Sequence, residues 1–334
     1  MRSYRATIVF PTLLLAALLA VPALAQAPPA SNPSWPTRPI TFIVPYAAGG
    51  SVDAVARIVA VRMGERLGQT VVIENVAGAG GVTGTQRAAR AEPDGYTLLF
   101  SVESTMAIAK LVQPTTVQYD AQKDFRPITL IGTSPLVLAG KKELPAANLA
   151  ELMKYLRANP GKLSYATSGV GTSLQIAGEM INIEGGVRMQ HVPYRVGAQI
   201  VTDLAGNHVD LAVLPLVMAL PSYRGGNIKI FGITEPERSP LAPDLPSLAE
   251  ESELKNVQVT VWFALFAPAK VDDPIIERLH QAAAATLAEP EIRGKLAETS
   301  LRVVGSTPAE LGTFLAREIE KFAVIVKAAN IKAE

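Results

Sequence analysis

Three short glycine-rich segments carry the residues of this sequence that are best suited to binding chemistry. They are residues 47–53 (AAGGSVD), 75–84 (NVAGAGGVTG) and 168–173 (SGVGTS), and each follows a predicted strand and precedes a predicted helix. Backbone N–H groups at a helix N-terminus have no partner inside the helix, and the helix dipole favours negative charge there. Glycine lets a ligand oxygen approach those amides closely. The segments therefore predict an anion site, with ordinary tight turns as the alternative.

Polar side chains beside these segments extend the candidate site. Tyr46 and Tyr194 each follow a proline at a strand end, where they are either pocket walls or core residues. Asp53 is either an acceptor for a ligand hydroxyl or amine, or a first-turn carboxylate that stabilises its own helix. Both alternatives stay open for each of the three residues.

Hydroxyl side chains follow the third predicted strand and are further candidates for ligand contacts. These are Ser101, Ser104 and Thr105, and Glu103 lies among them. A glutamate here would repel a bound carboxylate unless its side chain points away. Trp262 lies inside a long apolar segment, so we expect it in the core rather than in a pocket.

Motifs typical of enzymes are absent from the sequence. His191, His208 and His280 lie far apart and lack metal-ligand spacing, and there is no H-E-x-x-H, no G-x-S-x-G and no cysteine. Residues 78–81 lack the Lys-Ser/Thr of a phosphate loop, and Thr83 stands where a dinucleotide-binding motif has its third glycine. The sequence therefore predicts a protein that is not an enzyme and that uses no cofactor or metal.

Strand and helix patterns alternate along the chain and would position these segments. Short β-rich segments are predicted at residues 40–45, 71–74, 96–101, 163–166, 189–193, 209–214 and 228–234. Helical spacing or capping signals begin near residues 51, 82, 148, 173, 198, 274 and 307. This alternation predicts parallel sheets with crossover helices.

Two longer β-rich segments, residues 128–138 and 257–267, divide this pattern into two α/β units. They predict two extended crossings between a first domain of residues 36–133 and 258–334 and a second domain of residues 134–257. The helices at the C-terminus are expected to return to the first domain.

The first 25 residues have the pattern of a secretory signal peptide. Two positive charges precede an apolar run at residues 8–19, and Ala23-Leu24-Ala25 predicts cleavage before Gln26. The run is too short for a membrane span. Residues 26–35 are predicted to form a disordered leader. The mature protein is therefore expected to be exported and soluble.

The net charge and the cysteine content limit the kinds of binding partner and of covalent or metal site that we expect. The formal charge of +1 becomes −1 when Arg2 and Arg5 leave with the signal peptide, and no basic run remains to favour nucleic acid or an anionic membrane. The chain has no cysteine, so we expect neither disulfides nor a thiolate metal site.

These motifs, in this order, resemble the tripartite tricarboxylate transporter substrate-binding family, also called Bug or TctC-like periplasmic receptors. The matching stretches span nearly the whole mature chain: PYAAGGSVD at 45–53, GAGG at 78–81, PDGYTLL at 93–99, DFRPI at 124–128, NPGKLSY at 159–165, SGVGT at 168–172, VPY at 192–194, DLAG at 203–206 and VD at 209–210.

The resemblance implies a type II periplasmic-binding-protein fold, in which two α/β domains close on a small carboxylate held by backbone amides, hydroxyls and waters. It implies a monomeric receptor in the periplasm that delivers its ligand to membrane transporter subunits. A sensory receptor for a membrane signalling partner and a secreted enzyme are the alternatives. The predicted ligand-binding residues are Tyr46, Ala48, Gly49, Gly50, Ser51, Asp53, Gly80, Gly81, Ser101, Ser104, Ser168, Gly169, Gly171, Thr172, Tyr194 and Asp210.

The chain also departs from the family pattern. Val52 stands at a common Thr and Gln175 at a common His, and the other departures are Val76-Ala77 and Arg195-Val196. Val52 removes a possible hydroxyl contact. Because backbone amides recognise the charge and not the rest of a ligand, the class stays open among mono-, di- and tricarboxylates and aromatic acids.

Overall fold

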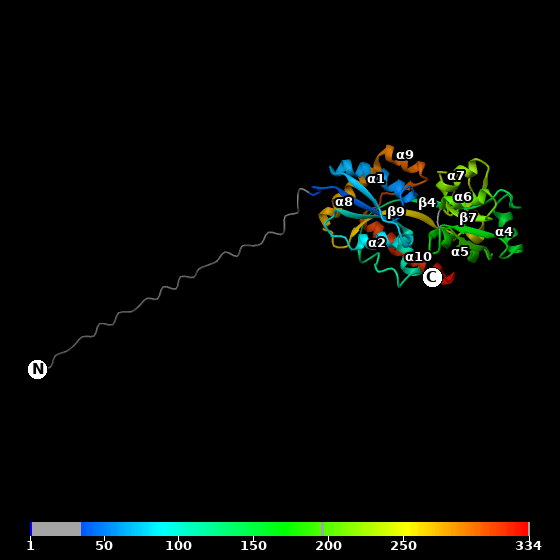
Figure 1. The fold of residues 1–334 in the computed structure, drawn as a ribbon, viewed down its shortest axis with the longest axis horizontal. Coiled ribbons are helices and arrows are strands. Elements are labelled where there is room, and N and C mark those ends of the chain that lie inside the picture. The colour runs from blue at the N-terminus through cyan, green and yellow to red at the C-terminus, as the bar shows by residue number, and fades with distance from the viewer. Residues whose placement is uncertain (2–34, 195–196, 333–334) are drawn as a thin grey trace. The chain divides into compact units, whose positions relative to one another are not determined.

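The computed structural model describes Met1 and residues 35–194 and 197–332, and the chain from Trp35 onward forms one compact unit (Figure 1). The predicted signal peptide, most of the predicted leader and the departure at Arg195-Val196 lie outside the described residues. None of the described helices is both long enough and apolar enough to span a membrane.

A ten-stranded mixed sheet runs through this unit in the order β2-β1-β3-β9-β4-β7-β5-β6, with β8 and β10 also paired to β4. The strands are β1 (Ile40–Val44), β2 (Val71–Asn75), β3 (Thr97–Val102), β4 (Phe125–Lys141), β5 (Ser164–Thr167), β6 (Gln190–Pro193), β7 (Leu211–Pro215), β8 (Ile228–Ile233), β9 (Thr260–Pro268) and β10 (Arg302–Val303).

Two groups of parallel strands lie at opposite ends of this sheet. In the first strand set, β1 pairs in parallel with β2 and β3, and in the second strand set, β5 pairs in parallel with β6 and β7. The long strand β4 joins them, because its first part pairs with β9 and its second part with β7 and β8. These long strands β4 and β9 are the crossings expected from the sequence. The two domain boundaries themselves remain a prediction.

The helices follow from apolar spacing and from local start and stop signals. They are α1 (Ser51–Leu67), α2 (Val82–Ala89), α3 (Ala109–Val112), α4 (Leu149–Ala158), α5 (Ser173–Glu184), α6 (Gly197–Ala205), α7 (Leu216–Arg224), α8 (Asp273–Ala288), α9 (Pro290–Glu298) and α10 (Pro308–Ala328). In α1, buried Val52, Val55, Val59 and Met63 form one apolar face, and Gly68 ends the helix with a φ of 71°.

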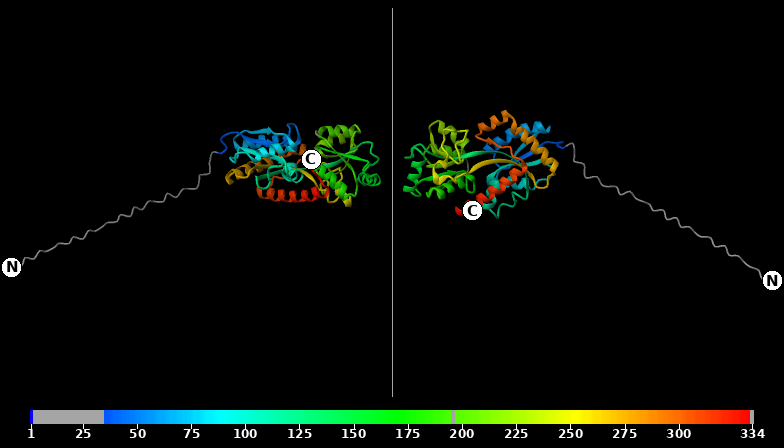
Figure 2. Two further views of the ribbon diagram at one scale, coloured as in Figure 1. Left: turned by 60° about the horizontal axis from the view of Figure 1, so that its bottom comes forward. Right: turned by 180° about the vertical axis from the view of Figure 1, so that it is seen from behind.

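The C-terminal helix α10 connects distant parts of the fold. Thr307 and Glu310 form a capping box at its start, as the sequence predicted. The helix packs against β4 and against the short turn η2 (Ser104–Ile108), and it also reaches α5 (Figure 2). Its Glu318 accepts a hydrogen bond from the Nε1 of Trp262, which is fully buried on β9 as expected.

Apart from short 3-10 turns, three helical segments are additional to those expected from the sequence. The helix α7 contains Pro221, whose missing N–H and ring normally argue against a helix interior. The segment η2 is a single π-helical turn that continues into α3, and it is too short to show apolar periodicity. The helix α9 follows α8 with only Glu289 between them.

Candidate functional site

Asp53 organises the first glycine segment. Its Oδ2 accepts a hydrogen bond from the Gly49 N–H at 2.9 Å, its Oδ1 accepts one from Asn75 Nδ2 at 3.0 Å, and Arg57 lies 2.9 Å from the carboxylate. Burial alone would raise the pKa of Asp53, but the Arg57 guanidinium and the two hydrogen bonds from Gly49 and Asn75 outweigh it and lower this pKa. The structure therefore favours the interpretation of Asp53 as a local stabiliser.

The second glycine segment packs directly against the first. Asn75 Nδ2 also donates to the Tyr46 carbonyl at 3.0 Å. Gly81 has a φ of 98°, and a Cβ on it would lie 2.6 Å from Thr105 and 3.0 Å from the Tyr46 ring. Only glycine fits there, so Gly81 holds the two segments and the end of β3 together.

The helices that follow these two segments begin without a side-chain cap. Gly50 is the N-cap of α1 and Gly81 is the N-cap of α2, and neither provides a side chain for the first-turn N–H groups. Gly50 is exposed, and a Cβ on it would make only an ordinary contact with the Ala47 carbonyl at 3.6 Å. The first-turn amides of α1 are therefore available to a ligand oxygen. In α2, the N–H groups of Val82 and Thr83 already donate to the carbonyls of Ala79 and Gly78.

The third glycine segment, which enters α5, supports part of its own backbone. Gln175 Oε1 accepts the Gly171 N–H at 2.8 Å, so this amide is already occupied. Thr172 caps α5 by accepting from the Gln175 N–H, and it donates to the Gly169 carbonyl at 2.9 Å. Ser168 is exposed at the start of the segment. The remaining amides and the Ser168 hydroxyl are the groups left for a ligand.

His191 supports the third glycine segment through Thr167. Its Nε2 lies 2.7 Å from Thr167 Oγ1, which donates to the Gly169 carbonyl, and its ring packs 5.0 Å from the ring of Tyr165. Burial lowers the pKa of His191. This is the structural role expected from the sequence.

Glu103 connects the ends of β3 and β9 to the start of α5, which follows the third glycine segment. Its Oε1 accepts from Ser173 Oγ at 2.7 Å and from Ser104 Oγ at 3.1 Å, and its Oε2 accepts from the Trp262 N–H at 3.1 Å. The side chain is 2% exposed, and burial raises the pKa of Glu103 to about 7. The carboxylate is thus turned toward the start of α5. The sequence analysis considered the charge of Glu103 but did not predict its contact with α5. A single acidic residue inside a largely apolar stretch could have indicated it.

Tyr46 contributes a buried hydroxyl to this region. Its Oη has no hydrogen-bond partner among the described residues. Burial first, and then the charge of Glu103 and the nearby Tyr119, raise the pKa of Tyr46 well above its usual value. A buried hydroxyl without a partner is costly, so a ligand or a water is expected to satisfy it.

Three predicted site residues have other partners. Asp210 forms an ion pair with Lys141 at 2.6 Å and accepts from the Ser164 N–H at 2.9 Å. Asp210 lies directly before β7 and beside Ser164, the first residue of β5. The third glycine segment follows the last residue of β5. Because β5 and β7 are parallel, Asp210 lies at the N-terminal end of these strands and the glycine segment at their C-terminal end, which removes Asp210 from the site.

Ser101 and Tyr194 are also engaged within the protein. Ser101 is fully buried, and its Oγ shares a hydrogen bond with Thr105 Oγ1. The Tyr194 hydroxyl donates to Asp203 at 2.8 Å, and its backbone N–H donates to the Thr167 carbonyl. Ser101 therefore has no exposed surface for a ligand contact. The half-buried Tyr194 flanks the third glycine segment.

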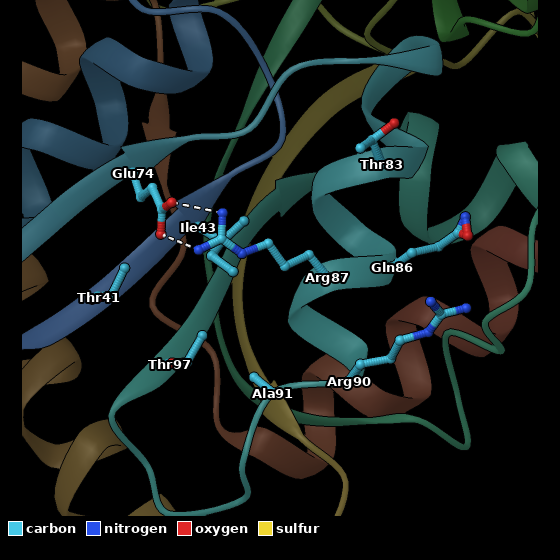
Figure 3. Close-up of a pocket in the computed structure, with 9 residues that line it drawn as sticks. All are labelled: Thr41, Ile43, Glu74, Thr83, Gln86, Arg87, Arg90, Ala91 and Thr97. Carbon is cyan, nitrogen blue, oxygen red and sulfur yellow. Dashed lines mark hydrogen bonds and ion pairs between the residues drawn. The ribbon is translucent and has the colours of Figure 1, made fainter.

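A separate groove of about 650 Å³ lies between the first strand set and α2 (Figure 3). Its lining is polar, and Glu74 and Arg87 form an ion pair across it at 2.7 Å. The lining contains none of the predicted ligand-binding residues. Over the described residues, no group of three or more potential ligand side chains is arranged to hold a metal ion.

Comparison with known proteins supplies the family. Residues 55–331 match the model of the tripartite tricarboxylate transporter family receptor. The protein BugT of Bordetella pertussis is 32% identical over 306 residues, which cover 92% of this chain and 94% of BugT. A second Bordetella pertussis protein is 32% identical over 325 residues, covering 97% of this chain and 99% of that protein.

Solved structures share the fold. A structure described as a periplasmic transporter is 34% identical with a TM-score of 0.81, covering 90% of this chain and 99% of its own. MatC from Rhodopseudomonas palustris, solved with bound malate, is 32% identical with a TM-score of 0.78 (87% and 100% covered). Another R. palustris protein, solved with adipate, is 31% identical with a TM-score of 0.82 (89% and 99% covered).

These matches confirm the predicted fold class and the resemblance that the sequence motifs carried. They also agree with the prediction that the chain is not an enzyme, because the matching family is one of transport receptors. The chain belongs to the tripartite tricarboxylate transporter receptor family, whose solved relatives are periplasmic binding proteins.

Proposed function

We propose that this protein is a periplasmic receptor that binds a small organic carboxylate with the backbone amides and hydroxyls of its three glycine segments. The observation that carries the proposal is the uncapped start of α1 at Gly50, in the glycine segment that follows Tyr46, together with the buried and unpartnered hydroxyl of Tyr46. Together they provide donors for an anion and a hydroxyl that lacks a partner. The malate and adipate in the two R. palustris relatives support the same ligand class.

The proposed contacts are Tyr46, Ala48, Gly50, Ser51, Gly80, Ser104, Ser168 and Thr172, with Tyr194 beside them. The Gly81 N–H already donates to the Gly78 carbonyl and the Gly169 N–H to Thr167 Oγ1, so these two glycines shape their segments. Gly49, Asp53 and Gly171 shape the segments from within, because their polar groups already bond to each other or to Gln175.

The strength of such a site is sufficient for a receptor. A hydrogen bond to a charged group contributes roughly 1.5–3 kcal/mol net. Three or four of these would reach the roughly 8 kcal/mol of a micromolar complex, before the ordering costs of binding are subtracted. The proposal includes delivery of the ligand to membrane transporter subunits, which the family name supports. It also includes cleavage of the signal peptide before Gln26, which the N-terminal sequence supports. The receptor is proposed to be a monomer.

A thermal-shift panel of malate, adipate, citrate and benzoate, compared with the neutral diamide of adipate, tests the ligand class. We expect at least one carboxylate to raise the melting temperature and the diamide to have no effect, because the uncapped amides attract negative charge. Calorimetry would then give the affinity. If no carboxylate stabilises the protein, or if adipate and its diamide stabilise it equally, the proposed function is wrong.

A further inference from the structure

Glu103 occupies the junction between the parts of the molecule that carry the proposed site. It directly follows β3 of the first strand set, its Oε2 accepts the backbone N–H of Trp262 on β9, and its Oε1 accepts the hydroxyl of Ser173 at the start of α5. Because β3 ends at Val102, opposite Phe263, the next N–H on β9 has no further residue of β3 to pair with. The Glu103 side chain takes that place.

The two oxygens of this carboxylate face different kinds of donor. A backbone N–H only donates, so Trp262 holds Oε2 as an acceptor in every protonation state. The hydroxyls of Ser173 and Ser104 both donate and accept, and both face Oε1. A proton on Oε1 would therefore find an acceptor without any change of backbone. The site is satisfied whether Glu103 is ionised or neutral.

The electrostatic surroundings leave the charge of Glu103 uncompensated. Among the described residues, no lysine or arginine forms an ion pair with it, and β9 contributes no ionisable side chain. The buried hydroxyl of Tyr46 lies close enough to feel its charge.

The charged groups on the neighbouring helices have partners of their own. On α5, Glu179 accepts from the Tyr165 hydroxyl at 2.6 Å. On α10, Glu318 accepts from Trp262 Nε1 and pairs with Lys321. Burial raises the pKa of Glu103 to about 7, so its proton occupancy changes near neutral pH.

We propose that Glu103 couples capture of an anionic ligand to uptake of one proton. The inference rests on the proposed function. A ligand carboxylate beside α5 repels an ionised Glu103, so the bound complex favours the neutral form. A proton from solvent forms an O–H bond at Oε1, the hydroxyls of Ser173 and Ser104 turn to accept it, and release of the ligand returns the proton.

Calorimetry with adipate and with malate, at pH 6 and pH 8 and in two buffers of different ionisation enthalpy, tests this coupling. The wild-type protein should take up a proton on binding at pH 8, where about nine-tenths of Glu103 is ionised, and its affinity should be about tenfold lower than at pH 6. Glu103→Gln keeps an acceptor for Trp262 and a donor for the serine hydroxyls. It should bind about equally at both pH values, with no proton uptake.

Glu318→Gln is the matched control, because Glu318 is also buried beside Trp262 but is paired with Lys321. It should keep the proton uptake of the wild type. In the ligand-free protein, a ¹³C carboxyl signal that is lost in Glu103→Gln should titrate near neutral pH.

The possible failures are distinguishable. Binding of adipate or malate without proton uptake, or uptake that persists in Glu103→Gln, overturns the inference and leaves the proposed function standing. A Glu103 signal that titrates near its ordinary value overturns the inference without any ligand. Absence of binding by every carboxylate overturns the proposed function and the inference together.

Discussion

Two buried carboxylates at the proposed site differ in charge environment. Asp53, in the first turn of α1, is 4% exposed, and Glu103, which bonds to the first residue of α5, is 2% exposed. The pKa of Asp53 is lowered and that of Glu103 is raised, although burial acts in the same direction on both. Two differences account for this. Asp53 lies near the surface beside the half-exposed Arg57, which pairs with it, whereas Glu103 lies deeper and has no such cation among the described residues.

This difference assigns separate tasks to the two ends of the proposed site. Asp53 remains ionised and holds Gly49 and Asn75, so the first glycine segment keeps its geometry across the physiological pH range. Glu103 changes protonation in that range, so the electrostatic potential beside α5 depends on pH. Depth of burial and a counter-cation together decide whether such a carboxylate stays ionised or titrates near neutral pH.

The largest effect is expected from Gly50→Val, which tests the proposed amide site at the Asp53 end. The added side chain would cover the uncapped first turn of α1, so affinity for adipate should fall about 100-fold, which corresponds to the loss of one or two charged hydrogen bonds. The melting temperature should stay within a few degrees, because nothing lies closer than 3.6 Å to a Cβ there.

Gly294→Val in α9 is the control for that substitution, since a Cβ on Gly294 meets no atom within 4 Å and the residue lies outside the proposed site. Affinity in this variant should equal that of the wild type. Unchanged affinity in Gly50→Val, measured by calorimetry, would remove the α1 terminus from the site.

The next effect concerns stability at the Glu103 end. The pKa of Glu103 is about 7 in the folded protein and 4.5 for an unperturbed glutamate, so the folded state binds the proton more tightly. Its contribution is fully present below pH 4.5 and is lost as the pH rises through 7. Between pH 5 and pH 8 the wild type should therefore lose about 2.5 kcal/mol of unfolding free energy that Glu103→Gln does not lose. Urea denaturation of both proteins at both pH values measures it, and parallel pH dependence would contradict the assignment.

A smaller effect is expected from Asp53→Ala. The change leaves the Gly49 N–H and the Asn75 amide without their acceptor, while half-exposed Arg57 is rehydrated, so the unfolding free energy at pH 7 should fall by about 2 kcal/mol. The pKa of Asp53 is lowered, so its stabilisation is present above pH 3.8 and is lost as the pH falls through the folded value. The wild-type and Asp53→Ala denaturation midpoints should converge below that pH; a constant gap down to pH 2 would argue against an ionic role.

The smallest effect is expected from salt. The proposed contacts are amides and hydroxyls, so raising NaCl from 50 to 500 mM should change the affinity for adipate by less than about threefold. A steep loss in calorimetric titrations would show that a cationic side chain holds the ligand.

Much of the scaffold was predictable because it follows from local periodicity. The apolar face of α1, the capping box at Thr307 and the glycine segments after the first and fifth strands are encoded over a few residues each. The helix α7 was not predictable in this way, because Pro221 breaks the local rule and packing overrides it. The π-turn at η2 was missed because a single turn is too short to show apolar periodicity.

The site itself was only partly predictable. Local sequence placed the glycine segments at helix starts, because strand, turn and helix follow one another along the chain. Which amides are free was decided by side chains that reach back four residues, as Gln175 does to Gly171, and could not be read from composition. Asp210 was a poor candidate because the parallel direction of β5 and β7, a tertiary property, places it at the opposite end of these strands from the glycine segment.

The sequence alone determined the alternation of strands and helices, the absence of cysteine and the family, because these depend on residue type and order. The export signal is a prediction from the same kind of local pattern. Only the tertiary structure decided the partners of Asp53 and Glu103. Arg57 reaches Asp53 along one helix, whereas Glu103 meets Ser173 and Trp262 across 70 and 159 residues of chain. Contacts over such separations arise only when the sheet assembles, and they set the charge that each carboxylate carries.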